Sequence, residues 1–234
     1  LSARGIRRHK LLDRHVESGH GDATALIWEG NNPAEDKTFT YSELLLEVKR
    51  FANVLKAQGI RKGDRVCIYL QMIPELPIAM LACARIGAVH SVVFGAFSPE
   101  SLQARINDSA CKLLITQDAA VRGARSGLPM KANADEAVAE CPSIERVIVV
   151  RRTGDAVNFD AARDIWWHEA MANASDDCPP EEMDAEDPLF ILYTSGSTGQ
   201  PKGVLHTTGG YLVFTSYSHE VIFDYHEGDV YWCT

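Results

Sequence analysis

A stretch of ten residues near the end of the chain has the composition of a phosphate-binding loop. Residues 194–203 read Thr-Ser-Gly-Ser-Thr-Gly-Gln-Pro-Lys-Gly, with four hydroxyl side chains, three glycines and one lysine. Glycines let backbone N–H groups approach a ligand closely, hydroxyl groups suit phosphate oxygens, and a lysine supplies positive charge. Because the stretch follows an apolar run over residues 189–193, the sequence predicts a strand that leads into a cradle for nucleotide phosphates.

Two better-known motifs do not fit these residues. A Walker A loop ends in Gly-Lys followed by Ser or Thr, whereas Lys202 here precedes Gly203 and Val204. The G-x-S-x-G pattern of a nucleophile elbow does not occur in the sequence. Two alternatives stay open, a flexible Gly/Ser turn without a ligand and a hydrolase that uses Ser195 with His206. The apolar run directly before the loop favours the phosphate cradle over both.

A second basic motif lies in the middle of the chain, where Arg122 and Arg125 flank Gly123 and Ala124. Two guanidinium groups three residues apart can converge on one phosphate, because each offers a planar fork of N–H donors. On spacing alone, a solvated basic loop explains the pair more simply. The pair is therefore a candidate phosphate site that needs a second observation.

The segments before the loop alternate between strand-like and helix-like patterns. Thr40 and Glu43 occupy the two positions of a capping box, and apolar residues follow at helical spacing until Gly59 stands at the C′ position. Ser98 before Pro99 marks the start of another helix. Further helices are predicted over residues 74–86 and 132–140, and strands over 23–28, 65–70, 88–94, 112–116, 146–150 and 189–193.

This alternation predicts an α/β fold with a mostly parallel sheet and helices on both faces. Continuous apolar runs such as residues 113–115 and 147–150 are typical of strands that are covered on both sides. In open parallel sheets, ligands bind beyond the carboxyl ends of the strands. The loop after residue 193 is therefore expected in a position that can bind a ligand.

The charge of the chain is negative and unevenly distributed. The sequence has 23 Lys and Arg against 32 Asp and Glu, a net charge of −9. Seven acidic residues fall within residues 176–187, which we interpret as a solvated connection between folded parts. An acidic chain argues against a nucleic-acid partner. No apolar run approaches the ~18 residues that span a bilayer, so no membrane partner is expected.

The six cysteines show none of the spacings typical of metal ligands, so no metal site on the protein is predicted. The first three, Cys67, Cys83 and Cys111, stand in apolar segments. They are expected to be buried free thiols in a reducing compartment, which favours a cytoplasmic location.

Three separated blocks resemble one family. Residues 193–203 resemble the phosphate-binding signature of the adenylate-forming superfamily, which includes acyl-CoA synthetases, luciferases and peptide-synthetase adenylation domains. Residues 80–95, the continuation over 204–213, and residues 224–234 are similar to the AMP-forming acetyl-CoA synthetases within it. The resemblance covers nearly the whole chain from about Leu12 onward.

This resemblance implies that the chain belongs to the large N-terminal domain of an adenylate-forming enzyme. It also implies that the enzyme catalyses a two-step reaction. ATP and acetate form acetyl-adenylate and pyrophosphate, and coenzyme A then displaces AMP to give acetyl-CoA. ATP, Mg²⁺ and coenzyme A are the implied substrates and ion. By position, the resemblance implies that Lys202 is catalytic and that Arg122 and Arg125 contact the nucleotide phosphate of coenzyme A. The residues implied to hold the ATP phosphates are Thr194, Ser195, Gly196, Ser197, Thr198, Gly199 and Lys202.

The resemblance also suggests how the chain is divided. We expect a divergent arm over residues 1–11, a first α/β part of the AMP-binding domain over 12–175, an acidic linker over 176–188, and the start of the next sheet portion over 189–234. The domain is expected to be cut short at 234, so this chain alone is expected not to catalyse the full reaction. Alternatives are a propionate-using or other short-chain acyl-CoA synthetase and a non-catalytic nucleotide-binding module. The oligomeric state is not predicted.

Overall fold

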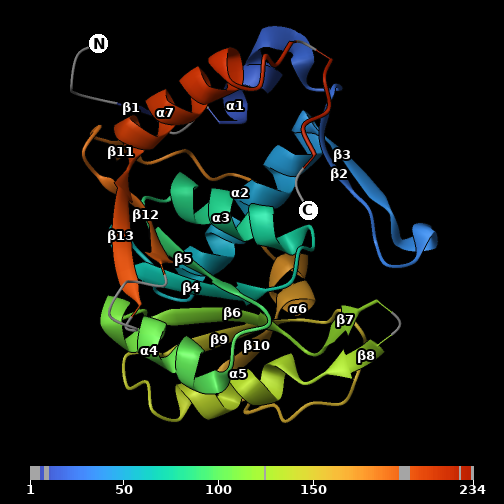
Figure 1. Ribbon diagram of the computed structural model, residues 1–234, viewed down its shortest axis with the longest axis vertical. Helices are drawn as coiled ribbons and strands as arrows, with labels where there is room; N and C mark the ends of the chain where they lie inside the picture. Colours follow the sequence, from blue (N-terminus) through green and yellow to red (C-terminus); the bar gives the residue numbers. More distant parts are fainter. Residues whose placement is uncertain (1–5, 8–10, 124, 195–200, 227, 233–234) are drawn as a thin grey trace.

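A computed structural model describes residues 6–7, 11–123, 125–194, 201–226 and 228–232. Within these residues a seven-stranded sheet has the strand order β10-β9-β6-β4-β5-β12-β13 (Figure 1). Neighbouring strands are parallel except for β12 and β13, which confirms the predicted, mostly parallel sheet. The strands of this sheet are β4 (Arg65–Leu70), β5 (Val89–Phe94), β6 (Leu113–Gln117), β9 (Arg146–Val150), β10 (Asp164–Trp166), β12 (Pro188–Thr194) and β13 (Lys202–Thr207).

Shorter strands form two-stranded pairs outside this sheet, and helices connect the strands. The paired strands are β1 (Ile6–Arg7) with β11 (Glu182–Met183), β2 (Thr24–Trp28) with β3 (Lys37–Thr40), and β7 (Ala120–Arg122) with β8 (Arg125–Leu128). The helices are α1 (Asp13–His15), η2 (Val16–His20), η3 (Pro33–Glu35), α2 (Tyr41–Ala57), α3 (Glu75–Arg85), α4 (Pro99–Ser109), α5 (Met130–Val138), α6 (Trp167–Ala172) and α7 (Thr208–Val221).

Helices cover both faces of the sheet, as predicted. In Figure 1, α2 and α3 lie on one side of the strands, and α4 and α5 lie on the other. The side chains of β4 divide accordingly, because successive residues of a strand point to opposite faces. Val66 and Ile68 belong to the hydrophobic core that contains α2 and α3, whereas Cys67 and Tyr69 belong to the core that contains α4 and α5.

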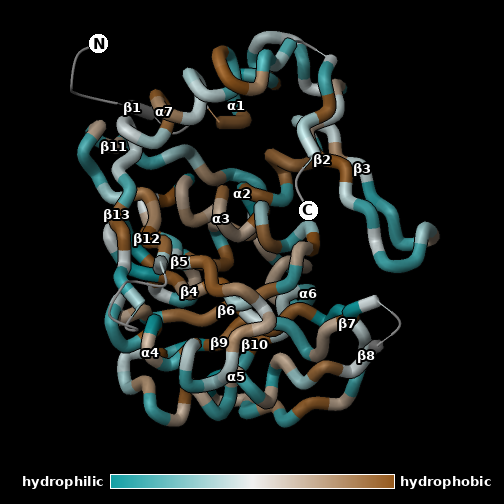
Figure 2. The backbone as a smooth tube through the Cα atoms, viewed as in Figure 1, coloured by the Kyte–Doolittle hydropathy of each residue, from teal (hydrophilic) through white to brown (hydrophobic). Residues whose placement is uncertain are grey.

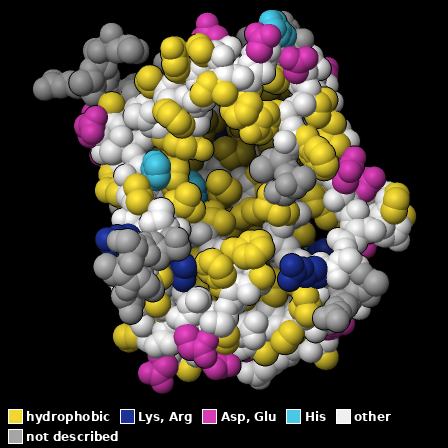
Figure 3. Space-filling model, viewed as in Figure 1, with side chains coloured by type: hydrophobic (Ala, Val, Ile, Leu, Met, Phe, Trp, Pro, Cys, Tyr) yellow, Lys and Arg dark blue, Asp and Glu magenta, His cyan; other side chains and the backbone are white. Residues whose placement is uncertain are grey.

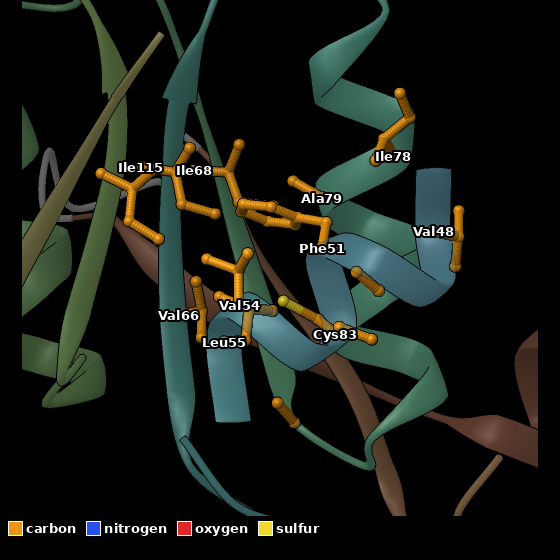
Figure 4. Packing of buried hydrophobic residues seen from close by; sticks show 14 of the residues in the cluster. Val48, Phe51, Val54, Leu55, Val66, Ile68, Ile78, Ala79, Cys83 and Ile115 are labelled. Carbon is orange, nitrogen blue, oxygen red and sulfur yellow. The ribbon is translucent and has the colours of Figure 1, made fainter. Parts of the chain in front are cut away.

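The core beneath α2 is centred on Phe51, which is 0% exposed. Its ring stacks on that of Trp167 with 3.6 Å between ring centroids. Figure 4 shows the same ring beside Ile68 of β4 and Ala79 of α3. Figure 2 shows that hydrophobic residues concentrate along the central strands. The sheet therefore has a packed layer on this face that fixes the positions of its strand ends.

The capping box at the start of α2 is confirmed. The Glu43 N–H donates to Thr40 Oγ1 over 3.2 Å, and the Thr40 N–H donates to Glu43 Oε2 over 2.9 Å. The helix ends before Gly59, whose φ of +85° lies in the left-handed region that glycine adopts without strain. The start and the end of this helix are thus both encoded locally.

Replacing Thr40 with alanine should lower the free energy of unfolding by about 1 kcal/mol, because an N–H at the helix start loses its acceptor. Urea denaturation followed by circular dichroism measures this loss. Thr38→Ala is the matched control, because Thr38 is an exposed threonine two residues earlier in β3. Equal losses for the two variants would contradict the capping role.

The acidic segment lies against the folded part at several points. Most of its carboxylates are exposed, as expected, but Cys178 and Met183 are buried. Lys62 Nζ lies 3.1 Å from Asp187 Oδ2 and donates to the Glu182 carbonyl. The domain boundaries at 175 and 188 stay predictions, and most of the predicted arm over 1–11 lies outside the described residues.

The five described cysteines are buried free thiols, which confirms the expectation for Cys67, Cys83 and Cys111. Cys233 lies outside the described residues. In the described part of the chain, no helix combines the length and apolar character needed to cross a membrane.

A broad apolar surface covers one face of the molecule. Figure 3 shows hydrophobic side chains around a central hollow on this face. Many of the exposed large hydrophobic side chains of the described residues belong to β13, α7 and the residues after α7, including Leu205 (54% exposed), Phe214 (68%) and Trp232 (78%). A contiguous apolar surface of this kind is typical of a face that contacts another protein part or a ligand.

Candidate functional site

The predicted phosphate loop connects two antiparallel strands. β12 ends at Thr194 and β13 begins at Lys202, and these two residues are register partners across the hairpin. Directly opposite residues of an antiparallel pair have Cβ atoms about 4.5–5.5 Å apart. The structure therefore brings two of the predicted ATP-phosphate residues together at the base of the loop, and both are exposed. The others, Ser195, Gly196, Ser197, Thr198 and Gly199, lie outside the described residues.

A strand, and not a helix, follows the loop. In a Walker A site the loop opens a helix, whose N-terminus adds partial positive charge beside the phosphates. Here the chain continues as β13, and α7 begins only at Thr208. The N-terminus of α7 therefore does not directly follow this loop, and the exposed Lys202 at the first position of β13 supplies positive charge there.

The two predicted coenzyme-site arginines lie in a second hairpin. Arg122 ends β7, Arg125 begins β8, and their backbones are register partners on either side of a turn that includes Gly123, whose φ is +58°. The side chain of Arg122 is exposed, and that of Arg125 lies outside the described residues. The backbone geometry is therefore that of a tight basic hairpin tip.

Gln71 holds this hairpin against the sheet. It follows the last residue of β4, and its side-chain amide bonds both polar groups of the Val121 backbone. The Val121 N–H donates to Gln71 Oε1 over 2.9 Å, and Gln71 Nε2 donates to the Val121 carbonyl over 2.8 Å. A side chain at the carboxyl end of one strand thus positions the residue before Arg122.

The two hairpins lie apart. β7 follows β6, and the strands β4 and β5 separate β6 from β12 in the sheet. In Figure 1 the β7–β8 hairpin and the β12–β13 hairpin lie on opposite sides of the molecule. They are therefore suited to different phosphate groups and not to one shared phosphate.

His206, the base of the hydrolase alternative, is a packing residue here. Its ring stacks on Phe190 with centroids 4.4 Å apart, and it lies edge-to-face with Tyr211 at 6.0 Å. Ser195 lies outside the described residues. The stacking in a strand favours a structural role for this histidine.

Sequence reasoning missed two residues that shape the site. Asp118, just beyond β6, is 1% exposed and accepts hydrogen bonds from the N–H groups of Ala119, Arg152 and Gly154. Gln71 occupies the equivalent place after β4. A polar residue directly after an apolar strand could have indicated both positions in the sequence, because ligands bind at the carboxyl ends of the strands of a parallel sheet.

Among the residues that the structure describes, no group of three or more His, Cys, Asp or Glu side chains could hold a metal ion. No described residue is therefore assigned to a metal.

Comparison with known protein families gives a match over nearly the whole chain. The family model described as "AMP-binding enzyme" matches residues 12–234. The chain belongs to the AMP-binding enzyme family. The β12–β13 hairpin and the β7–β8 hairpin both fall within the matched residues.

Curated relatives of this chain in the family are acetyl-coenzyme A synthetases. Those of Syntrophus aciditrophicus and Magnetococcus marinus are 63% and 58% identical over 226 residues, and that of Rubrobacter xylanophilus is 62% identical. Each alignment covers 97% of this chain and 35% of the relative, so the chain spans about a third of their length. The structure of an acetoacetyl-CoA synthetase from Streptomyces lividans has a TM-score of 0.86 at 27% identity, covering 96% of this chain and 34% of that one.

Proposed function

We propose that this chain is part of an enzyme that activates acetate with ATP and transfers the acetyl group to coenzyme A. In the first step an acetate oxygen attacks the α-phosphorus of ATP, and the bond to pyrophosphate breaks. In the second step the coenzyme A sulfur attacks the acetyl carbon, and AMP leaves. The observation that carries the proposal is the identity of about 60% to acetyl-coenzyme A synthetases over nearly the whole chain.

The first step needs neutralisation of charge more than it needs a base. Acetate and the triphosphate are both anionic, so their approach is opposed until positive charge and N–H or O–H donors surround the phosphates. Lys202 and the hydroxyl of Thr194, which face each other across the hairpin, are proposed to do this together with residues 195–199. Mg²⁺ that accompanies the triphosphate would add positive charge when bound. Within this part of the mechanism no protein nucleophile is required.

The second step needs a place for coenzyme A. The β7–β8 hairpin is proposed to bind the nucleotide phosphate of coenzyme A through Arg122 and Arg125. This assignment is consistent with its separation from the β12–β13 hairpin, because coenzyme A carries a phosphate far from its reactive sulfur. A cytoplasmic location belongs to the same proposal. Buried free cysteines are typical of proteins in a reducing compartment.

Arg122→Ala is expected to raise the KM for coenzyme A about tenfold, because a charge-assisted hydrogen bond to phosphate is lost. Acetyl-adenylate formation should stay within about twofold of the wild type, since the hairpin is distant from the phosphate loop. Measuring the two half-reactions separately checks this. Arg61→Ala, which alters an exposed arginine elsewhere, is the control. Equal losses in both half-reactions would contradict the assignment.

Assays with several carboxylic acids test whether acetate is the preferred substrate. The protein that carries this chain is assayed for ATP–pyrophosphate exchange with acetate, propionate and acetoacetate in parallel. The proposal predicts the highest kcat/KM with acetate. A higher kcat/KM with propionate or acetoacetate would show that this acid, and not acetate, is the substrate of the same adenylation reaction. The absence of exchange with every acid would favour a non-catalytic nucleotide-binding module.

A further inference from the structure

Tyr193 stands directly before the phosphate loop and is held from three directions. Its hydroxyl donates to Asp108 Oδ2 over 2.5 Å, which joins β12 to the last turn of α4. The guanidinium carbon of Arg105 lies 5.6 Å from the centre of the Tyr193 ring. Gly203 is its register partner in β13. The contacts come from two elements, α4 and β13, so they fix the ring relative to both.

The glycine opposite Tyr193 is closely packed. A Cβ atom on Gly203 would lie 3.2 Å from both Cε1 and Cζ of the tyrosine ring and 3.1 Å from Ile191 Cγ2. These separations are shorter than ordinary van der Waals contact, so a side chain there would require the ring or Ile191 to shift by a few tenths of an ångström. Gly203 follows Lys202 directly, so this close packing lies next to the lysine in β13.

Asp108 is an exposed residue in the last turn of α4, where the partial negative charge of the helix end opposes an acidic group, and that turn contains no basic residue. The Tyr193 hydroxyl donates a hydrogen bond to this carboxylate. Burial, followed by the hydrogen bond to Asp108 and its negative charge, raises the pKa of Tyr193 well above its usual range. The tyrosine therefore remains a neutral donor at physiological pH.

We propose that Tyr193 and Asp108 form a clamp that positions the base of the β12–β13 hairpin, so that Thr194 and Lys202 hold the geometry needed for the ATP phosphates. Both are positioning residues that act through their neighbours. The inference rests on the proposed function of the hairpin, and it adds the coupling of that hairpin to α4. Small displacements of a binding group can lower rates strongly, because the binding energy depends on pre-organised geometry.

The test compares variants of the full-length protein that carries this chain. Tyr193→Phe removes the hydroxyl and keeps the ring. It is expected to raise the KM for ATP about tenfold in acetate-dependent pyrophosphate exchange, because a hydrogen bond to a charged group is lost. The KM for acetate should stay within about twofold, since only the phosphate loop is displaced. Asp108→Ala should have the same effect, and Asp108→Asn, which keeps an acceptor oxygen, should restore most of the ATP affinity.

A double variant and a control variant distinguish a positioning role of Tyr193 and Asp108 from an effect on the overall stability of the protein. If Tyr193 and Asp108 act as one clamp, the double variant Tyr193→Phe/Asp108→Ala should lose no more than either single variant. Asn53→Ala removes hydrogen bonds from Asn53 to the carbonyls of Ser175 and Asp177, away from the hairpin. This control should lower stability without a selective change in the KM for ATP.

Hydrogen exchange provides a readout that does not depend on activity. The amides of the peptide spanning residues 189–207 should exchange at least about fivefold faster in Tyr193→Phe than in the wild type, because the clamp restrains this hairpin. A KM for ATP and an exchange rate both within twofold of the wild type would overturn the clamp and leave the proposed function intact. A wild type without acetate-dependent activity would overturn the proposed function, and hydrogen exchange would still decide whether the clamp exists.

Discussion

Lys202→Ala is expected to lower acetate-dependent ATP–pyrophosphate exchange by about 10³-fold, at the upper end of the effect of removing one transition-state charge donor. The structural reason is that a strand follows the phosphate loop, so no helix N-terminus can replace the lost positive charge. The variant should fold normally, because the side chain is exposed at the first position of β13. Measuring exchange rates with purified, full-length protein checks the prediction.

Two further variants sharpen this result. Lys202→Arg keeps the charge in a different shape and should retain an intermediate rate, because a guanidinium does not reproduce the compact ammonium group. Lys37→Ala is the matched control, since Lys37 is likewise an exposed lysine at the first position of a strand. An exchange rate for Lys202→Ala within about tenfold of the wild type would contradict the role of Lys202.

Phe51→Ala is expected to lower the free energy of unfolding by about 3–5 kcal/mol, the usual cost of removing a buried aromatic ring from a packed core. Phe51 is fully buried, and its ring stacks on Trp167 of α6, so the substitution removes a contact between α2 and α6 as well as leaving a cavity. Since native domains are stable by only about 5–15 kcal/mol, much of the protein should be lost on expression at 37 °C. Urea denaturation followed by circular dichroism measures the change.

A half-exposed apolar residue supplies the comparison. Ile27 of β2 is 50% exposed, and Ile27→Ala should cost less than about 1 kcal/mol because it leaves little cavity. If Phe51→Ala cost no more than this control, the core beneath α2 would not be packed as the structure describes it.

Much of the fold could be predicted from local signals. Thr40 and Glu43 predicted the start of α2, and apolar runs predicted β4, β5, β6, β9 and β12 to within about two residues, because each signal lies inside the element that it specifies. The short parallel strand β10 was not predicted. The pairing of β2 with β3 and the course of β13 were not predicted. β3 is four residues long, and β13 contains a glycine and a lysine, so both depend on pairing with the preceding strand for their strand structure.

The sequence likewise predicted some features of the candidate site and not others. Lys202, Arg122 and Arg125 were predicted from residue type, spacing and resemblance, and their assignments to ligands stay predictions. The arrangement of Thr194 opposite Lys202 could not be predicted, because it follows from the register of an antiparallel hairpin. The contact of Tyr193 with Asp108 joins residues 85 positions apart, and no local pattern encodes it.

We propose that this chain serves acetate activation through an acyl-adenylate. The most direct measurement incubates the full-length protein with acetate, ATP, Mg²⁺ and coenzyme A and quantifies every product. We expect acetyl-CoA, AMP and pyrophosphate in equal amounts, formed only when acetate is present. Formation of ADP and phosphate, or no acetyl-CoA despite bound ATP, would contradict it.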